Sequence, residues 1–215
     1  VNPLQFGKNE DYSKYPRTEE TDIQKLTKEK CDILFIPNNK NEVFPEYEKL
    51  KKLTTGKLGD ELCGKIRPGH FDGVLTVVNK IFEIIKPDMA IFGAKDYQQQ
   101  ILIKQMAKNL HPSLTLLKAP IVRSKNGVAL SSRNNYLSKK EISLASNLFK
   151  CLENSVESYK KNILLIEIIE NAKNFLISKN LDPDYFELRD TKLNIIKENN
   201  FNGKKIFLSS VKINS

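Results

Sequence analysis

The sequence predicts an α/β fold with a parallel sheet, followed by a smaller α+β domain. Through the first half of the chain, short apolar runs that end at proline or glycine alternate with segments of helical periodicity, as in a doubly wound sheet. The chain has 215 residues, of which 40% are hydrophobic and 28% charged, enough for a packed core. After Pro120 the alternation of strands and helices gives way to two long helical segments and two strand-like runs, which indicates a second domain.

The N-terminal residues Val1–Phe6 read as the end of a strand already under way, so we expect the chain as given to be a fragment. Gln5 then follows a strand end and precedes a polar loop, Gly7–Lys14, which we expect to be a mobile gate. An ordinary loop glutamine is the alternative. Thr18 is a suitable N-cap for a helix that carries Asp22, whose carboxylate either holds a cation or faces solvent.

The next elements lead to a second, clearer helix. Asp32–Pro37 predicts a buried strand, and a polar, irregular stretch follows it. The segment Arg67–Gly73 then precedes a helix whose apolar stripe should pack on the sheet. His70 lies just before this helix, where it either orients a ligand or caps the helix. The stripe consists of Val74, Val77, Val78, Ile81, Phe82 and Ile85.

The run Met89–Phe92 predicts a short strand buried on both faces, and Gly93 permits a turn that a side chain would obstruct. Lys95 and Asp96 therefore lie where a strand ends and a helix begins. In an open parallel sheet this edge binds ligands, and a helix N-terminus favours anionic groups such as phosphate. Most α/β proteins also have such turns without a ligand. The helix is predicted from Gln99, Leu102, Ile103, Met106 and Leu110.

We predict the next strand over Leu114–Pro120, after a surface turn at His111. A third stretch with candidate functional residues follows this strand. Asn126-Gly127 predicts a two-residue hairpin turn. The row Ser131-Ser132-Arg133 comes next, and its hydroxyl and guanidinium donors suit phosphate oxygens. A turn followed by a helix cap is the alternative.

The C-terminal part predicts two helices and two strands. Ser138 and Glu141 form a capping box that opens a helix through about Lys160. The remaining elements are a helix over Leu164–Ile177 and strands over Tyr185–Leu188 and Lys205–Val211.

The net charge of +9 raises a nucleic-acid hypothesis, because a basic face gives sequence-independent affinity for phosphates. The lysines are scattered among glutamates and asparagines, without an aromatic-interleaved patch or zinc-ligand spacing, so we predict no nucleic-acid partner.

No run is long enough to span a membrane, and no secretory leader opens the chain, so neither membrane insertion nor secretion is expected. The three cysteines, Cys31, Cys63 and Cys151, lie far apart and fit reduced thiols of a cytoplasmic protein.

Arginine is rare in a chain that otherwise uses lysine for positive charge. A guanidinium offers a planar, two-pronged set of donors, so each arginine is a candidate either for carboxylate or phosphate recognition or for a structural ion pair. The arginines are Arg17, Arg67, Arg123, Arg133 and Arg189.

Five segments, taken together, resemble the pantoate–β-alanine ligases, a family also called pantothenate synthetases. Their order and intervals fit as well, and the resemblance covers essentially the whole chain. The segments are Val1–Phe6, Tyr15–Thr18, Arg67–Phe71, Phe92–Gln99 and Ala129–Asn134.

The resemblance implies a Rossmann-like nucleotidyltransferase domain with a parallel sheet over residues 1–119, N-terminally incomplete, and an α+β lid domain over residues 120–215. It implies a cytoplasmic homodimer that condenses (R)-pantoate with β-alanine. ATP first converts pantoate to pantoyl adenylate and pyrophosphate, and the amine of β-alanine then displaces AMP. Mg²⁺ accompanies ATP as the cofactor.

The resemblance also implies a role for each site residue. Lys95 and Arg133 would be catalytic, with Lys95 on the phosphates. Gln5 and Gln99 would bind pantoate, Gln5 would also lie near β-alanine, and Asp22 matches a position associated with magnesium. The ATP-binding residues would be Gly93, Ala94, Lys95, Asp96 on the ribose, Val122 through its backbone, Leu130, Ser131, Ser132 and Arg133.

Two departures from the family pattern bear on activity. The histidine-containing phosphate signature of the family should precede Val1, and without it we expect this polypeptide to be a poor catalyst. Ala94 stands where many relatives carry glutamate. The nearest alternative function is another nucleotidyltransferase of the same superfamily, and the alternative from a different class is a non-catalytic basic nucleic-acid-binding domain.

Overall fold

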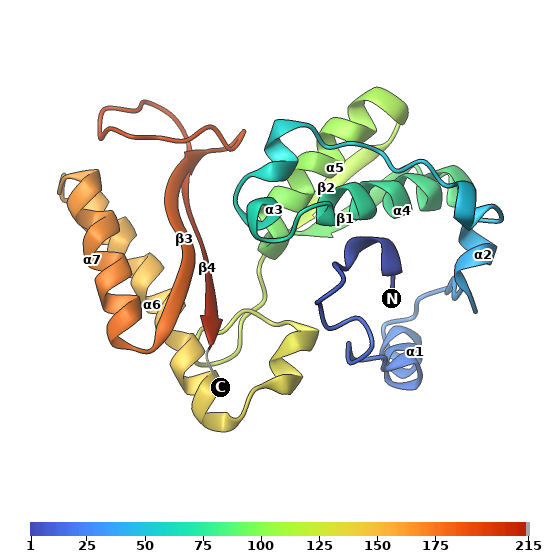
Figure 1. Ribbon diagram of the computed structural model, residues 1–215, viewed down its shortest axis with the longest axis horizontal. Helices are drawn as coiled ribbons and strands as arrows, with labels where there is room; N and C mark the ends of the chain where they lie inside the picture. Colours follow the sequence, from blue (N-terminus) through green and yellow to red (C-terminus); the bar gives the residue numbers. More distant parts are fainter. Residues whose placement is uncertain (214–215) are drawn as a thin grey trace. The chain divides into compact units, whose positions relative to one another are not determined.

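The computed structural model describes residues 1–213, apart from the side chain of residue 48, and divides into two compact units (Figure 1). The first unit comprises Val1–Phe92 and Leu102–Lys118, and the second comprises Gly93–Ile101 and the chain from Ala119 onward. The predicted domain boundary after residue 119 stays a prediction. No helix within residues 1–213 is long and apolar enough to cross a membrane.

The first unit is built on helices α4 and α5 and strands β1 and β2, which follow a series of short helical segments. Strands β1 and β2 are hydrogen-bonded neighbours in a parallel sheet, joined through α5. The elements in this part of the chain are η1 (Pro3–Gln5), α1 (Glu19–Lys28), α2 (Lys40–Val43), η2 (Tyr47–Lys49), η3 (Lys57–Asp60), α3 (Cys63–Ile66), α4 (His70–Ile85), β1 (Met89–Gly93), η4 (Ala94–Asp96), α5 (Tyr97–Leu110) and β2 (Thr115–Ala119).

The apolar stripes of α4 and α5 form the core of the first unit, as their spacing predicts. One end of the predicted α4 stripe was wrong, because Ile85 lies in the last turn of that helix and is exposed. The helix predicted through Leu110 is confirmed, since α5 ends at this residue. The buried residues of this core are Phe71, Val74, Leu75 and Phe82 of α4, and Leu102, Ile103 and Met106 of α5.

Strand β1 confirms the strand predicted at Met89–Phe92, but the prediction that both of its faces are buried was wrong. Ala90 and Phe92 pack against the core, whereas Met89 and Ile91 are 55% and 64% exposed. Successive side chains of a strand point to opposite faces, and the core covers only one of them here.

Two further strand predictions in the first unit were also wrong. Asp32–Pro37 is irregular and Ile33–Ile36 is exposed, because this segment belongs to neither of the two described sheets and so has no strand to pair with. Val1–Phe6 contains the 3₁₀ helix η1 instead of a strand end. The side chain of Asn2 caps η1 by accepting from the N–H of Leu4, so Gln5 is the last residue of a helical turn.

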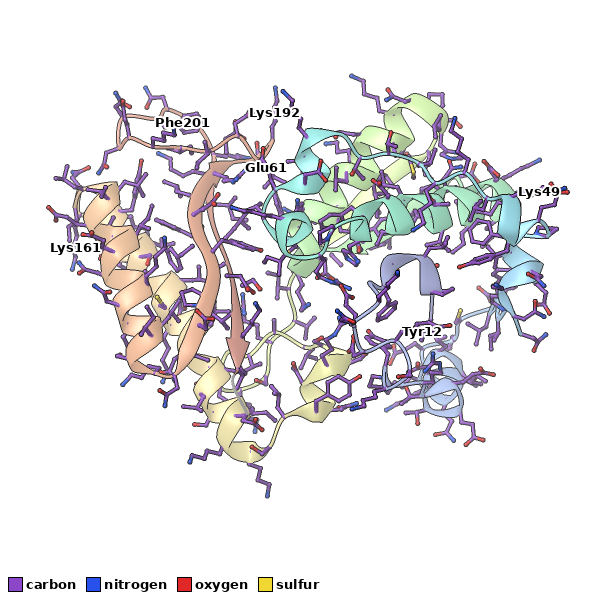
Figure 2. All side chains as sticks on the ribbon, viewed as in Figure 1. Tyr12, Lys49, Glu61, Lys161, Lys192 and Phe201 are labelled. Atoms are coloured by element: carbon purple, nitrogen blue, oxygen red, sulfur yellow. The ribbon has the colours of Figure 1, made fainter. Side chains whose placement is uncertain are left out.

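The second unit has the α+β organisation that the sequence predicts. Its helical elements are η5 (Ser132–Tyr136), α6 (Lys139–Lys160) and α7 (Leu165–Ser178), and Lys161 lies just past the end of α6 (Figure 2). The capping box of Ser138 and Glu141 is present at the start of α6. Strands β3 (Leu181–Asp190) and β4 (Lys205–Ile213) pair antiparallel and enclose a core with α6 and α7.

Strand β3 begins earlier than predicted. Pro183 cannot donate to a ladder, but the register shifts between Pro183 and Tyr185, and such an irregularity accommodates a proline within a strand. The strand therefore runs through a residue that the sequence pattern treats as a break.

Candidate functional site

The turn between β1 and α5 presents the polar residues that the sequence singles out. Gly93 has φ of −70°, and a Cβ built on it meets no atom within 4 Å, so the prediction that a side chain would obstruct this turn was wrong. Open space beside its backbone remains available to a ligand. Ala94, Lys95 and Asp96 form η4, which leads directly into α5.

Lys95 and Asp96 form an ion pair with each other, in which Nζ lies 3.2 Å from Oδ1. The two side chains are 39% and 60% exposed, so water screens this pair and it is weak. The N–H groups and dipole at the start of α5 add positive potential at this position. The turn therefore favours an anion that can compete with Asp96 for Lys95.

The first turn of α5 is anchored within the second unit. The hydroxyl of Tyr97 donates to the carbonyl oxygen of Thr191 at 3.1 Å. Burial and the nearby charge of Asp190 raise the pKa of Tyr97, so it remains a donor at neutral pH. Gln98 is buried, whereas the predicted pantoate residue Gln99 is half-buried.

A hairpin follows β2, as predicted, but its turn differs in detail. The N–H of Gly127 bonds to the carbonyl of Ser124, so Lys125 and Asn126 are the central residues. Gly127 comes next with φ of 88°, which is the position of the glycine in a three-residue hairpin loop with a bulge. Leu130 N–H bonds to the carbonyl of Val122 and closes the hairpin, while both of these side chains are exposed.

The row Ser131-Ser132-Arg133 combines a helix cap with two further side-chain donors, one of them exposed. Ser131 accepts from the N–H of Arg133 and caps η5, which confirms the structural reading of this row. Ser132 is exposed and Arg133 is half-buried. The same segment therefore retains a hydroxyl and a guanidinium that suit phosphate oxygens.

Four further arginines contact groups of the protein, and two of them, Arg67 and Arg189, form the structural ion pairs that the sequence left open. Arg17 donates to the carbonyls of Tyr12 and Tyr15. Arg123 donates to the carbonyl of Gly127 and lies 3.9 Å from the centroid of the Phe149 ring. Arg189 pairs with Glu187, and Arg67 pairs with Glu10.

Gln5 is held by residues that the sequence analysis did not assign to the site. The side-chain amide of Asn2 donates to Oε1 of Gln5 at 3.3 Å and to the carbonyl of Gly73 at 3.2 Å. His70 Nδ1 lies 2.7 Å from the carbonyl oxygen of Gln5. His70 is the first residue of α4 and is buried, but no side-chain cap bond is formed there. In the sequence, the only sign that His70 belongs near the site was its position in the segment Arg67–Phe71, one of the five that resemble the family.

Asp22 lies on the exposed surface of α1. Its carboxylate accepts from the hydroxyl of Thr18 at 3.1 Å and lies 3.8 Å from Nζ of Lys25. Within residues 1–213, no group of three or more histidine, cysteine or acidic side chains is placed to hold a metal ion. Asp22 and its neighbours therefore do not build a magnesium site by themselves.

The predicted residues divide between the two units. Gln5 and Asp22 belong to the first unit, whereas Gly93–Asp96, Gln99, Val122 and Leu130–Arg133 belong to the second. Two hollows, of about 210 and 470 Å³, are lined by other residues. The larger one lies beside α4 and includes Lys49, Thr76 and Glu83.

His111 begins the predicted turn, since the N–H of Leu114 bonds to its carbonyl at 3.0 Å, but its side chain is half-buried and not on the surface. Its ring packs edge-on against Phe82, with centroids 5.3 Å apart, and Nε2 lies 2.8 Å from Oδ1 of Asn79. It therefore ties the end of α5 to α4 and has no direct part in the candidate site.

The solved structures most informative for this fold are two crystal structures. The pantoate-β-alanine ligase from Thermus thermophilus superposes with a TM-score of 0.92 at 32% identity, over 99% of this chain and 76% of that protein. The ligase from Francisella tularensis, complexed with β,γ-ATP and β-alanine, superposes with a TM-score of 0.76 at 32% identity, over 98% of this chain and 76% of that protein.

Sequence comparisons agree with the structures. The pantothenate synthetase of Acinetobacter baylyi is 38% identical over 198 residues, which are 92% of this chain and 70% of that protein. The enzyme of Shewanella woodyi is 42% identical over 193 residues, which are 89% of this chain and 68% of that protein. The family model described as pantoate-beta-alanine ligase matches residues 1–215. This chain therefore belongs to the pantoate-beta-alanine ligase family.

Proposed function

We propose that this chain catalyses the ATP-dependent condensation of (R)-pantoate with β-alanine to give pantothenate, AMP and pyrophosphate. The observation that carries the proposal is the family match across residues 1–215, supported by curated relatives at about 40% identity. The solved relative from Francisella tularensis contains β,γ-ATP and β-alanine, which are compatible with two of the three proposed substrates.

ATP would bind at the start of α5. Lys95 would take the phosphates, because its pairing with Asp96 is exposed and an anionic phosphate competes well for its ammonium group. Asp96 would then accept from the ribose hydroxyls. Gly93 and Ala94 would allow close approach of the nucleotide to the backbone, and Val122, Leu130 and Ser131-Ser132-Arg133 would complete the ATP site.

Pantoate would be bound by Gln5 and Gln99, with Gln5 also near β-alanine. Two amides can fix a small hydroxy acid by donating and accepting hydrogen bonds without adding charge. The bond from Asn2 to Oε1 of Gln5 fixes one end of the Gln5 amide, and its NH₂ group would donate to an acceptor of the ligand.

The first step joins a carboxylate oxygen of pantoate to the α-phosphorus of ATP, and the bond from that phosphorus to the β-phosphate oxygen breaks to release pyrophosphate. In the second step the neutral amine of β-alanine attacks the acyl carbon, AMP leaves with the bonding electrons, and the nitrogen loses a proton. Both steps need positioning and positive charge more than covalent catalysis. Lys95 and Arg133 would supply that charge as catalytic residues.

Magnesium would enter with ATP. Mg²⁺ is usually held by substrate phosphates, water and only one or two carboxylates, so a site of this kind does not require a protein-built cage. The contribution of Asp22 remains a prediction, since Lys25 and Thr18 already contact its carboxylate. The ion would neutralise phosphate charge, and none of the steps above is assigned to it.

We further propose a cytoplasmic homodimer in which residues 1–119 bind nucleotide and pantoate and residues 120–215 act as a lid. Cys31, Cys63 and Cys151 are free thiols, which is typical of a reducing compartment. Light scattering on purified protein tests the dimer, and a monomeric mass would contradict it.

The decisive experiment measures pyrophosphate release by the intact parent protein. Release that requires both ATP and pantoate supports the proposal, and subsequent β-alanine addition should yield pantothenate and AMP. Release with a different acid or phosphate acceptor in place of pantoate would favour another nucleotidyltransferase. A salt-sensitive affinity for nucleic acid without any ATP requirement would favour the non-catalytic alternative.

A further inference from the structure

Two polar side chains of the first unit, His70 and Arg67, converge on the backbone carbonyl of Gln5, and Glu10 holds one of them. His70 Nδ1 lies 2.7 Å from the carbonyl oxygen of Gln5, and Nη2 of Arg67 donates to the same oxygen at 3.4 Å. Arg67 Nη1 lies 3.1 Å from Nε2 of His70. Nε of Arg67 donates to Oε1 of Glu10 at 2.9 Å, and Nη2 pairs with Oε2 of the same carboxylate.

The partners of His70 define its protonation pattern. A carbonyl oxygen only accepts, so Nδ1 of His70 carries the proton that is donated to Gln5. A guanidinium only donates, so Nε2 accepts from Arg67 and carries no proton. These two contacts fit an imidazole with its proton on Nδ1, which acts as donor to Gln5 and acceptor from Arg67 at once.

Glu10 extends this network into the loop Gly7–Lys14. The hydrogen bond and charge of Arg67 lower the pKa of Glu10, so the carboxylate stays ionised and balances the guanidinium at neutral pH. The ring of Phe6 packs edge-on against Tyr12, labelled in Figure 2, and against Tyr15, with centroids 5.3 and 5.6 Å apart. The loop that we expected to be a mobile gate is thus attached to the residues that hold Gln5.

We infer that His70 is a positioning residue for Gln5. Its Nδ1–H fixes the carbonyl of Gln5, Asn2 fixes the side-chain oxygen, and Arg67 with Glu10 orients the imidazole. Together these bonds present the Gln5 amide in one direction. The inference rests on the proposed role of Gln5 in binding pantoate, and it makes Arg67 and Glu10 supports of a substrate residue rather than substrate ligands.

Two conservative variants test the geometry of this arrangement. The amide of an asparagine reaches the position of Nδ1, whereas that of a glutamine reaches the position of Nε2. His70→Asn should therefore keep the donor to Gln5 and leave KM for pantoate within about threefold of the wild type, whereas His70→Gln should lose it and raise that KM about tenfold or more. KM for ATP should stay within about twofold in both variants, because ATP is assigned to other residues.

The outcomes separate positioning from a purely structural role. A lowered melting temperature in His70→Gln with an unchanged KM for pantoate would overturn the inference, and so would equal effects of the two variants on that KM. If His70→Gln does not fold, Glu10→Gln serves in its place. It should raise KM for pantoate by a smaller factor, about two- to fivefold, and an unchanged KM would then count against the network.

The same assays distinguish failure of this inference from failure of the proposed function. Wild-type protein that releases no pyrophosphate with pantoate and ATP contradicts the function itself, and with it the role of Gln5. Wild-type protein that is active, together with equal KM values for pantoate in His70→Asn and His70→Gln, contradicts only the positioning role of His70.

Discussion

Gly73 in α4 lies against the carbonyl of Leu4, so closely that a Cβ built on Gly73 would stand 2.0 Å from that oxygen. The same hypothetical atom would lie 2.7 Å from the backbone nitrogen of Gln5. Any side chain at this position would therefore push η1 away from α4. Since η1 ends at Gln5, this close approach determines where a proposed substrate residue stands.

Gly73→Ala should consequently destabilise the protein, although alanine is the better helix former by about 1 kcal/mol. The clash with backbone atoms should outweigh that preference and cost about 1–3 kcal/mol overall. Chemical denaturation measures the change. Gly93→Ala is the matched control for stability, because its Cβ meets no atom within 4 Å. Equal stabilities of the two variants would contradict the packing of η1 on α4.

The pairing of Glu10 with Arg67 should make stability depend on pH. The hydrogen bond from Arg67 lowers the folded-state pKa of Glu10 below its ordinary value of 4.5. A carboxyl of this kind stabilises the fold above its unfolded pKa, and the contribution disappears as the pH falls through the lower folded pKa. Glu10→Gln should therefore lower the melting temperature at pH 7, and the difference from the wild type should shrink as the pH falls below 4.5.

Glu46→Gln is the matched control for this measurement. Glu46 also pairs with a cation, Lys49, but both side chains are more than two-thirds exposed. Exposed ion pairs contribute little to stability, so this variant should have the melting temperature of the wild type at either pH. A loss in Glu10→Gln that persists at low pH would show that packing, and not the ion pair, stabilises this contact.

Lys95→Ala and Arg133→Ala, made separately, should each lower the rate of adenylate formation while leaving the fold intact. Removing one preorganised positive group or donor costs about 10²–10³-fold in rate. The exposed pair of Lys95 and Asp96 adds little stability, so circular dichroism and the melting temperature should not change for Lys95→Ala. Unchanged pyrophosphate release would refute the catalytic assignment of the residue concerned.

The cysteines should differ sharply in reactivity. Burial raises the pKa of the Cys151 thiol to about 11, and the thiol lies between α6 and α7. Cys31 is exposed. Because the thiolate is the nucleophile, iodoacetamide at about pH 8 should label Cys31 readily and Cys151 only after unfolding. Peptide mass spectrometry reads both sites, and comparable labelling of the two in native protein would contradict the burial.

Two neighbouring residues of α7 test the core of the second unit. Leu176 is fully buried, whereas Ile177 is 59% exposed. Leu176→Ala should cost about 2–5 kcal/mol because it leaves a cavity. Ile177→Ala should change stability by no more than about 0.5 kcal/mol. Similar losses in both variants would indicate that α7 presents a different face to β3 and β4.

Local sequence patterns predicted the elements that depend on local interactions. The stripe of α4, the capping box at Ser138 and the extent of α6 all arise from contacts within a few residues of one another. The strands predicted at Asp32–Pro37 and at Val1–Phe6 failed because an apolar run becomes a strand only when another segment pairs with it.

The residues of the candidate site also differ in whether local sequence patterns could identify them. Lys95, Asp96 and the row Ser131-Ser132-Arg133 could be identified because a strand end, a helix start and a run of donors are visible in the sequence. Asn2 and His70 could not be assigned in this way, since their partners are far away along the chain. Asn2 bonds to Gly73 across 71 positions, and His70 bonds to Gln5 across 65.

The sequence by itself determined the family, most of the helices and the residue types available to bind phosphate and a small hydroxy acid. Only the tertiary structure decided how Gln5 is held, which arginines serve as internal ion-pair partners and which face of β1 is covered. The physical reason is that propensity and capping act between neighbours, whereas burial and hydrogen-bond partners depend on the distant segments that folding brings together.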